Sequence, residues 1–161
     1  MPSFPSSGPQ RLTPTQAKPK IEKYCAYQER SHRQVLEKLR GYGLNSQEAG
    51  EMLVELLQSN FVSEERFAAS FVRGKFGLKG WGRAKIEQAL KREGLGARQI
   101  ETAMKEIPDQ RYEETLLRWA ERKAKSVSGT PFERKMKTKR FLVGKGYEPE
   151  AIDSVLSQLD F

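Results

Sequence analysis

Apolar positions recur three times along the chain in the same helix-turn-helix arrangement. In each copy a leucine is followed four residues later by a glycine, and then by a second set of apolar residues at helical spacing. The copies lie 51 and then 52 residues apart, with the anchor pairs Leu39 and Gly43, Leu90 and Gly94, and Leu142 and Gly146. Repetition at a fixed period is typical of stacked helical units, none of which buries its apolar face alone. The pattern favours an extended binding surface over a catalytic pocket.

The residues around each glycine fit the end of one helix and the start of the next. A glycine just past a helix often takes a left-handed backbone, so we expect positive φ at Gly43, Gly94 and Gly146. The residue two positions later is the expected N-cap of the following helix, namely Asn45, Gly96 or Glu148. No run of alternating apolar and polar residues indicates a strand. The sequence therefore predicts an all-α protein.

The predicted architecture is an elongated array of three tandem three-helix repeats. They are expected at 21–62, 63–108 and 109–161, with the first helix running from Ile21 to about Arg30. Residues 1–20 contain five prolines and are expected to form a disordered tail that is dispensable for folding.

Apolar spacing also predicts which side chains are buried. In the second repeat the expected core is Phe67, Phe71, Ile86, Leu90, Ile100 and Met104, with Ala68 and Val72 on the same stripe. In the last repeat the helix after Thr130 is expected to turn Phe132, Met136 and Val143 inward. The segment 74–82 holds four glycines and is expected to interrupt the helices.

Basic residues are concentrated in two blocks of the sequence. Residues 66–92 hold eight basic side chains and one acidic one, and residues 118–145 hold ten and two, in a chain of net charge +8. Such blocks are the footprint of a polyanion or of an acidic protein groove, although solvated helix faces are the alternative. The candidate contact residues for protein or DNA are Arg73, Lys75, Lys79, Arg83, Lys85, Arg134, Lys135, Lys137, Lys139 and Arg140.

The sequence offers little for catalysis. His32 is the only histidine, no spacing of His, Cys and carboxylates suits a metal, and no cofactor is expected. The glycine-rich run 77–82 lacks the Gly-Lys-Ser/Thr ending of a nucleotide-binding loop, so a flexible loop is favoured over a phosphate clamp. Within that run, Trp81 either stacks on a base or packs as a lid on the core. We therefore expect a protein that is not an enzyme.

Cysteine content and hydropathy bear on location. The single Cys25 cannot form an internal disulfide, which fits a reducing cytoplasm, and it is expected to pack as a small apolar side chain. No apolar run approaches the length of a membrane span. The expectation is a cytoplasmic monomer that does not bind membranes.

The second repeat carries the most specific string of residues. It reads Phe67-Ala68-Ala69-Ser70-Phe71-Val72-Arg73, then Gly80-Trp81-Gly82-Arg83-Ala84-Lys85-Ile86, Leu90 and Gly94-Leu95. This string resembles the RecX family of bacterial regulators of the RecA recombinase. The resemblance covers about residues 21–160, since that family is also built from tandem three-helix units, and the first and third repeats match as diverged copies.

The resemblance implies a non-enzymatic regulator of recombination, DNA repair and the SOS response. Members of that family are understood to lie in the helical groove of the RecA–DNA filament, where they block filament growth and promote disassembly. RecA recombinase, ATPase and SOS co-protease activities fall as a consequence. The partner implied is the RecA filament, and direct contact with single- or double-stranded DNA is left open.

A stand-alone DNA-binding protein of helix-turn-helix type is the alternative. Two helices joined by a short glycine turn are also the layout of such proteins, and basic helices could contact phosphates. However, the helices after Asn45, Gly96 and Glu148, where a recognition helix would lie, are acidic or nearly neutral.

Overall fold

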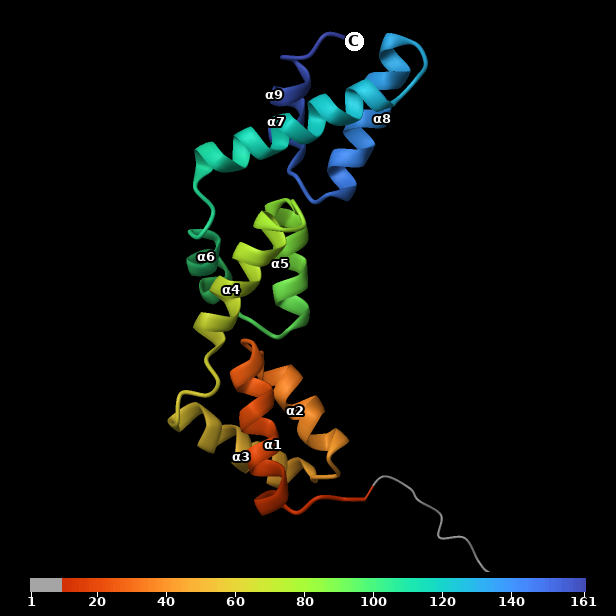
Figure 1. The fold of residues 1–161 in the computed structure, drawn as a ribbon. Helices are drawn as coiled ribbons and strands as arrows, with labels where there is room; N and C mark the ends of the chain where they lie inside the picture. Colours follow the sequence, from red (N-terminus) through yellow and green to blue (C-terminus); the bar gives the residue numbers. More distant parts are fainter. Residues whose placement is uncertain (1–9) are drawn as a thin grey trace, which may run out of the picture. The chain divides into compact units, whose positions relative to one another are not determined.

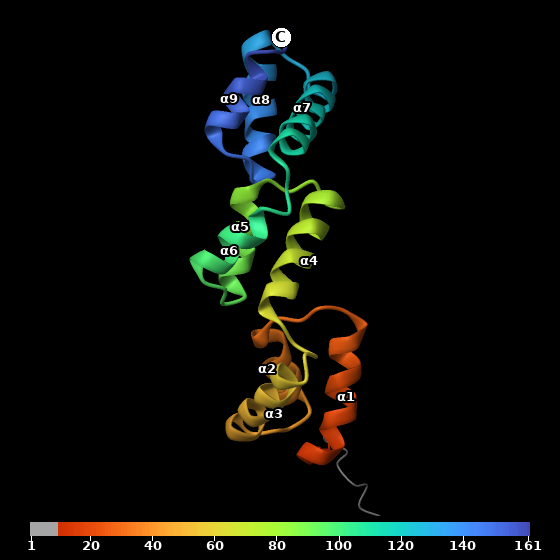
Figure 2. The ribbon, with the colours of Figure 1, turned by 90° about the vertical axis from the view of Figure 1, so that its left-hand side faces the viewer.

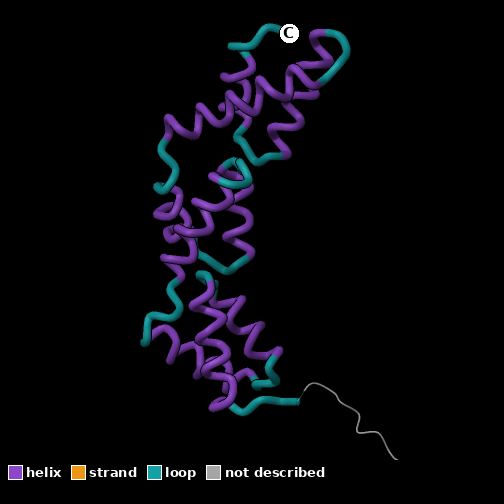
Figure 3. Tube along the Cα trace, viewed as in Figure 1, coloured by secondary structure: helices purple, strands orange, loops and turns teal. Residues whose placement is uncertain are grey.

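The computed structural model describes residues 10–161, which form nine helices and no strand (Figures 1 and 3). The all-α prediction is confirmed. The helices are α1 (Pro14–Tyr27), α2 (His32–Gly41), α3 (Ser46–Gln58), α4 (Glu64–Gly77), α5 (Arg83–Arg92), α6 (Ala97–Met104), α7 (Asp109–Ser126), α8 (Pro131–Gly144) and α9 (Pro149–Leu156).

The three glycine turns have the same geometry. Gly43, Gly94 and Gly146 have φ of 94°, 89° and 94°, as predicted. In each turn the backbone N–H of the next residue donates to the carbonyl of the anchor leucine at 3.2 Å. This is the bond that closes a helix end with a left-handed glycine, so three distant segments stop their helices by one mechanism.

Helix starts also follow the sequence signals. Ser31, Asn45 and Thr130 each cap a helix in a reciprocal capping box with the Gln or Glu three residues later. Gly96 and Glu148 occupy the N-cap positions of α6 and α9. Polar residues outside the apolar stripes thus fix where the helices begin.

The chain forms two compact units, one ending at Phe67 and the other comprising Ala68–Phe161. In the first unit α1, α2 and α3 pack around one core. Its buried members are Ala17, Ile21, Cys25, Val35, Leu39, Leu44, Ala49, Met52, Leu56 and Val62. Burial raises the pKa of the Cys25 thiol to about 11, because the interior disfavours the thiolate. Cys25 is therefore a packing residue, as expected.

Helix α1 begins seven residues earlier than Ile21, so the prediction that residues 14–20 belong to a disordered tail is wrong. Thr13 and Gln16 form a capping box, and Pro14 occupies the first turn, where proline costs least. Ala17 is fully buried, and the Leu12 N–H donates to the Tyr42 carbonyl at 2.8 Å. The prolines thus mark a helix start at this end of the segment. The part of the tail at 1–9 lies outside the described residues.

We expect a chain that begins at Lys20 to be less stable than the full chain, contrary to the expectation from composition. The deletion removes the α1 cap and the buried Ala17, and loss of a helix cap alone costs about 1 kcal/mol. The midpoint of thermal unfolding, followed by circular dichroism, should fall. The single substitution Thr13→Ala should give a smaller fall in the same direction. An unchanged midpoint for the deletion would contradict the placement of α1.

In the second unit, α4 to α6 are followed by α7, which packs against α8 and α9 (Figure 2). Two of the predicted core residues, Phe71 and Met104, are only partly buried, whereas Ile86, Leu90 and Ile100 are buried. The predicted break between the helices is present, but it is confined to residues 78–82, because α4 continues through Gly74 and ends at Gly77. A single glycine lowers helix stability without ending the helix.

The predicted inward face of α8 is also wrong. Phe132, Met136 and Val143 are 71%, 41% and 52% exposed, while Thr138 and Leu142 are fully buried. Thr138 and Leu142 are four residues apart and lie on the face of α8 that packs inward. Thr138 can be buried because its hydroxyl donates to the carbonyl of Arg134 at 2.9 Å.

Candidate binding site at the glycine-rich loop

The loop between α4 and α5 is tied to the turn between α8 and α9. The backbone N–H groups of Gly82 and Ala84 donate to the carbonyls of Lys145 and Gly146 at 2.8 and 3.0 Å. The Tyr147 hydroxyl donates to the Gly80 carbonyl at 2.9 Å. The loop is therefore held in place, contrary to the expected flexible loop, because its polar backbone groups are satisfied by another part of the chain. We call this contact of Gly80, Gly82 and Ala84 with Lys145, Gly146 and Tyr147 the joint.

Close backbone approach explains the glycines of this joint. A Cβ atom on Gly82 would collide with the carbonyl of Gly146, and one on Gly146 would collide with the side chain of Lys85. A Cβ atom on Gly80 would lie 2.5 Å from Nε1 of Trp119. Gly80 and Gly146 also have positive φ. The glycines therefore permit close packing within the second unit.

A buried tyrosine, Tyr112, forms hydrogen bonds to residues on both sides of the joint. Tyr112 is 3% exposed, and its hydroxyl donates to Oε2 of Glu148 at 2.6 Å while accepting the backbone N–H of Arg83 at 3.0 Å. Its ring packs against those of Phe76 and Tyr147, with centroids 5.9 and 5.1 Å away. Burial, and then the hydrogen bond to Glu148, raise the pKa of the Tyr112 hydroxyl.

Two of the candidate contact residues in this part of the chain are engaged in internal contacts. Arg73 pairs with Glu106 at 3.0 Å. Arg83 pairs with Asp109 at 2.8 Å, and its guanidinium lies 4.0 Å from the centre of the Tyr112 ring. These geometries give both arginines a structural role, whatever else they contact.

Two of the other candidates in this part of the chain lie against the indole of Trp81. The Nζ atoms of Lys75 and Lys85 lie 4.8 and 4.5 Å from the centre of its ring. Trp81 is partly buried beneath these cations. Both predicted roles of Trp81, stacking on a base and packing as a lid on the core, stay predictions.

A fourth lysine, Lys145, joins this group from the third glycine turn. Its Nζ donates to the Lys79 carbonyl at 3.3 Å, and its pKa is lowered by burial and then by the charges of Lys85 and Lys79. We call Lys75, Lys79, Lys85 and Lys145 the lysine cluster. Among the described residues, no carboxylate forms an ion pair with any of them. A bound anion would relieve their mutual repulsion.

The basic residues of α8 are only partly available. Arg134 donates to the Ala124 carbonyl at 2.9 Å, Lys137 to the Ser128 carbonyl at 2.7 Å, and Lys139 pairs with Asp153 at 2.8 Å. Lys135 and Arg140 are exposed and form no hydrogen bond or ion pair with any residue that the structure describes.

Residues that might have suggested an enzyme have other surroundings. His32 contacts Glu64, with Nδ1 and Oε1 3.1 Å apart, and lies at the start of α2. Over residues 10–161 no three His, Cys, Asp or Glu side chains gather closely enough to hold a metal ion. In the same part of the chain, no helix has the length and apolar character needed to cross a membrane.

Comparison with known proteins identifies the family. A model of the second three-helix domain of RecX matches residues 63–104, and a model of its third three-helix domain matches residues 110–156. Together these matches cover more than half of the chain. The chain belongs to the RecX family. The resemblance stated from the sequence is confirmed.

Curated relatives in the RecX family carry the name regulatory protein RecX. The protein from Lactobacillus gasseri is 30% identical over 141 residues, and that from Oceanobacillus iheyensis is 23% identical over 138 residues. Each alignment covers 85% of this chain but only 51% of the relative, so the chain spans about half the length of these relatives.

Solved structures of RecX share this fold. The crystal structure of RecX from Lactobacillus salivarius superposes with a TM-score of 0.81 at 24% identity, and covers 91% of this chain and 96% of that one. A second RecX crystal structure gives a TM-score of 0.79 at 19% identity, over 89% of this chain and 73% of that one. The chain thus has the fold of the solved RecX structures.

Proposed function

We propose that this protein binds the RecA–DNA filament and inhibits RecA by blocking filament growth and promoting disassembly. Membership of the RecX family carries the regulatory role. The lysine cluster supports a particular contact surface, since four cations without carboxylate partners are held by a joint of fixed backbone geometry. Recombinase, ATPase and SOS co-protease activities of RecA fall together if filament growth is the step affected. The protein acts as a monomer in the bacterial cytoplasm.

We select the proposed contact residues by the internal contacts that each basic side chain makes in the structure. The proposed contact residues are Lys75, Lys79 and Lys85, together with Lys145, whose Nζ also donates to the Lys79 carbonyl, and on α8 the exposed Lys135 and Arg140. Positive charge at these positions would guide the approach to acidic protein surfaces or to DNA phosphates. Arg73, Arg83, Arg134, Lys137 and Lys139 contribute to the same positive field while holding internal partners.

A variant with Lys79, Lys85 and Lys145 changed to Gln tests this surface. We expect at least about tenfold more protein to be needed for half-inhibition, which corresponds to about 1.4 kcal/mol of lost binding free energy. The measurement is DNA-dependent ATP hydrolysis by RecA on single-stranded DNA with substoichiometric inhibitor. A second variant, Lys135→Gln with Arg140→Gln, tests α8 in the same way. Added salt should weaken inhibition by the wild type.

The control changes Lys20, Lys23 and Lys105 to Gln, which removes the same number of charges elsewhere. These lysines are exposed, so the control should inhibit like the wild type. Circular dichroism establishes that every variant keeps its helices. Equal potency of the cluster variant and the control would show that the lysine cluster is no contact surface. If the wild type leaves RecA unaffected but binds DNA in a salt-dependent way, the stand-alone DNA-binding function replaces this proposal.

A further inference from the structure

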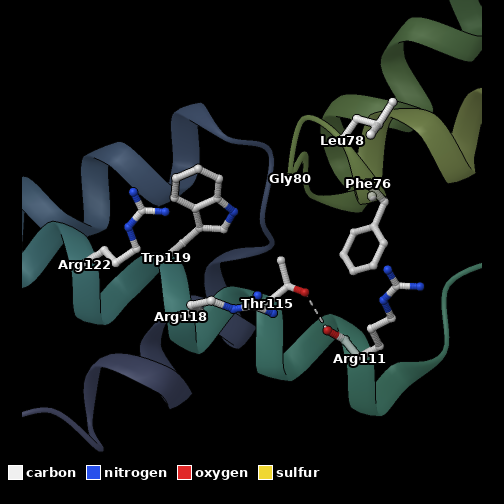
Figure 4. Close-up of a pocket in the computed structure, with 9 residues that line it drawn as sticks. Phe76, Leu78, Gly80, Arg111, Thr115, Arg118, Trp119 and Arg122 are labelled. Carbon is white, nitrogen blue, oxygen red and sulfur yellow. Dashed lines mark hydrogen bonds between the residues drawn. The ribbon is translucent and has the colours of Figure 1, made fainter.

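A second basic surface lies on α7, outside every candidate contact residue taken from the sequence. Arg111, Thr115, Arg118 and Arg122 are spaced by four, three and four residues, which places them along one face of the helix. The arginines span about 16 Å at 1.5 Å per helical residue. They line a cleft whose opposite wall comes from the end of α4 and the following loop, with Phe76, Leu78 and Gly80 (Figure 4).

The three arginines of this cleft have no acidic partner. All three are exposed, and none forms an ion pair with any residue in the described range 10–161. Two of them contact aromatic rings, since the guanidinium of Arg111 lies 5.7 Å from the centre of the Phe76 ring and that of Arg122 lies 5.5 Å from the centre of the Trp119 ring. No carboxylate lines the cleft. A guanidinium row of this kind is suited to carboxylates or phosphates, which it can bind through two parallel hydrogen bonds.

The cleft also presents apolar surface. Leu78 is 88% exposed, although it is a large aliphatic side chain beside a buried aromatic residue, Phe76. The cavity has a volume of about 190 Å³. That is below the usual range of small-molecule pockets, about 300–1,000 Å³, and suits one or two inserted side chains. The ligand chemistry indicated is therefore both anionic and apolar.

Neither aromatic ring at the cleft is fully open to nucleic-acid bases, because Phe76 is buried and Trp119 is partly buried. Trp119 packs against Gly80, with Lys145 at 4.0 Å from its ring centre and Phe141 at 5.8 Å. Phe76 is 4% exposed and packs on Tyr112. Single-stranded nucleic acid gains much of its binding energy by stacking bases on free aromatic faces. The cleft instead offers an aliphatic side chain between arginines.

We propose that the α7 cleft binds an acidic peptide segment of a partner protein, with a leucine-like side chain against Leu78 and carboxylates on Arg111, Arg118 and Arg122. The proposal stands on the cleft alone and holds whether or not the protein inhibits RecA. Charge complementarity selects the acidic side chains, and the exposed Leu78 selects the apolar one.

The test uses the full chain and a labelled acidic peptide of about twelve Asp and Glu residues interrupted by two leucines, the extended form that such grooves accept. Binding is measured by fluorescence anisotropy. We expect the variant with Arg111, Arg118 and Arg122 changed to Gln to bind at least about tenfold more weakly. The control with Lys20, Lys23 and Lys105 changed to Gln has the same net charge as the arginine variant. It should bind the peptide within about twofold of the wild type. Leu78→Ser should weaken binding of this peptide, but should not affect a peptide in which serines replace the leucines.

A spectroscopic readout locates the peptide. The indole N–H signal of Trp119, assigned by its persistence in Trp81→Phe, should shift on titration, because the ring lines the cleft. Three results would overturn the proposal: no binding of the peptide, equal losses for the arginine variant and the lysine control, or a stronger arginine dependence for oligothymidylate than for the peptide. The last result would assign the cleft to nucleic acid. Circular dichroism verifies that the variants are folded.

Discussion

Replacing Gly82 by alanine is expected to destabilise the second unit by about 2–3 kcal/mol, the upper part of the range for overpacked sites. The backbone of Gly82 has φ −76° and ψ 166°, which alanine adopts without strain. The entire penalty therefore comes from the collision of the new Cβ with the carbonyl of Gly146. Backbone atoms on both sides leave little room for relaxation, because each is held in a hydrogen bond of the joint.

Gly74→Ala is the matched control for this substitution. Gly74 lies inside α4, and no heavy atom lies within 4 Å of the position a Cβ would take. The control should gain up to about 1 kcal/mol, because alanine favours the helix. Urea unfolding followed by tryptophan fluorescence reports on the second unit selectively, since both tryptophans, Trp81 and Trp119, lie there. If Gly82→Ala unfolds at the wild-type urea concentration, the joint opens at no cost and does not fix the lysine cluster.

The helices could be predicted because their signals are local. A leucine, a glycine four residues later and a polar cap two residues beyond specify a helix end and the next helix start without reference to the rest of the chain. Gly43, Gly94 and Gly146 therefore behave as predicted. The early start of α1 is also encoded locally, in the Thr13 and Gln16 capping box, whereas the proline content of the segment favours disorder.

Contacts between distant segments could not be predicted from these signals. The sequence predicts a flexible loop at Gly80 and Gly82, since nothing local reveals that the carbonyls of Lys145 and Gly146 will accept the N–H groups of Gly82 and Ala84. Lys145 was missed as a member of the lysine cluster for the same reason. Neither Gly82 nor Gly146 has room for a Cβ atom. A glycine in a loop can thus be required by close packing and not by backbone flexibility.

The exposed row on α8 shows a limit of apolar periodicity. Phe132, Met136 and Val143 form a consistent helical stripe, and the sequence assigned that stripe to the core. The buried stripe instead contains Thr138, whose hydroxyl is satisfied within its own helix. A threonine that bonds to its own backbone can thus replace an apolar residue at a buried position, and periodicity alone does not distinguish the two faces. The sequence does not reveal the cleft on α7, because its arginines form a cleft only together with a second segment, the loop that carries Leu78.

Replacing Tyr112 by alanine is expected to cost about 3–5 kcal/mol, as for other large buried aromatic residues. The substitution removes the ring packed between Phe76 and Tyr147 and leaves Glu148 without its hydroxyl donor. Tyr112→Phe keeps the ring and should cost about 1–3 kcal/mol, the penalty for leaving buried polar groups unpaired. The exposed Tyr27 provides the control, because Tyr27→Phe should leave the urea midpoint unchanged.

The pH dependence separates the hydroxyl of Tyr112 from its ring. Burial raises the pKa of Tyr112 and of Tyr147 above the ordinary value of about 10, so both stay protonated in the folded state when they would ionise in the unfolded chain. Their stabilisation is complete below about pH 10 and is lost as the pH rises further. The wild type should therefore lose stability steeply as the pH rises above about 10, and Tyr112→Phe should lose less in that range. Parallel pH profiles for the wild type and Tyr112→Phe would show that the Tyr112 hydroxyl ionises freely, and hence that the bond to Glu148 does not hold the joint closed.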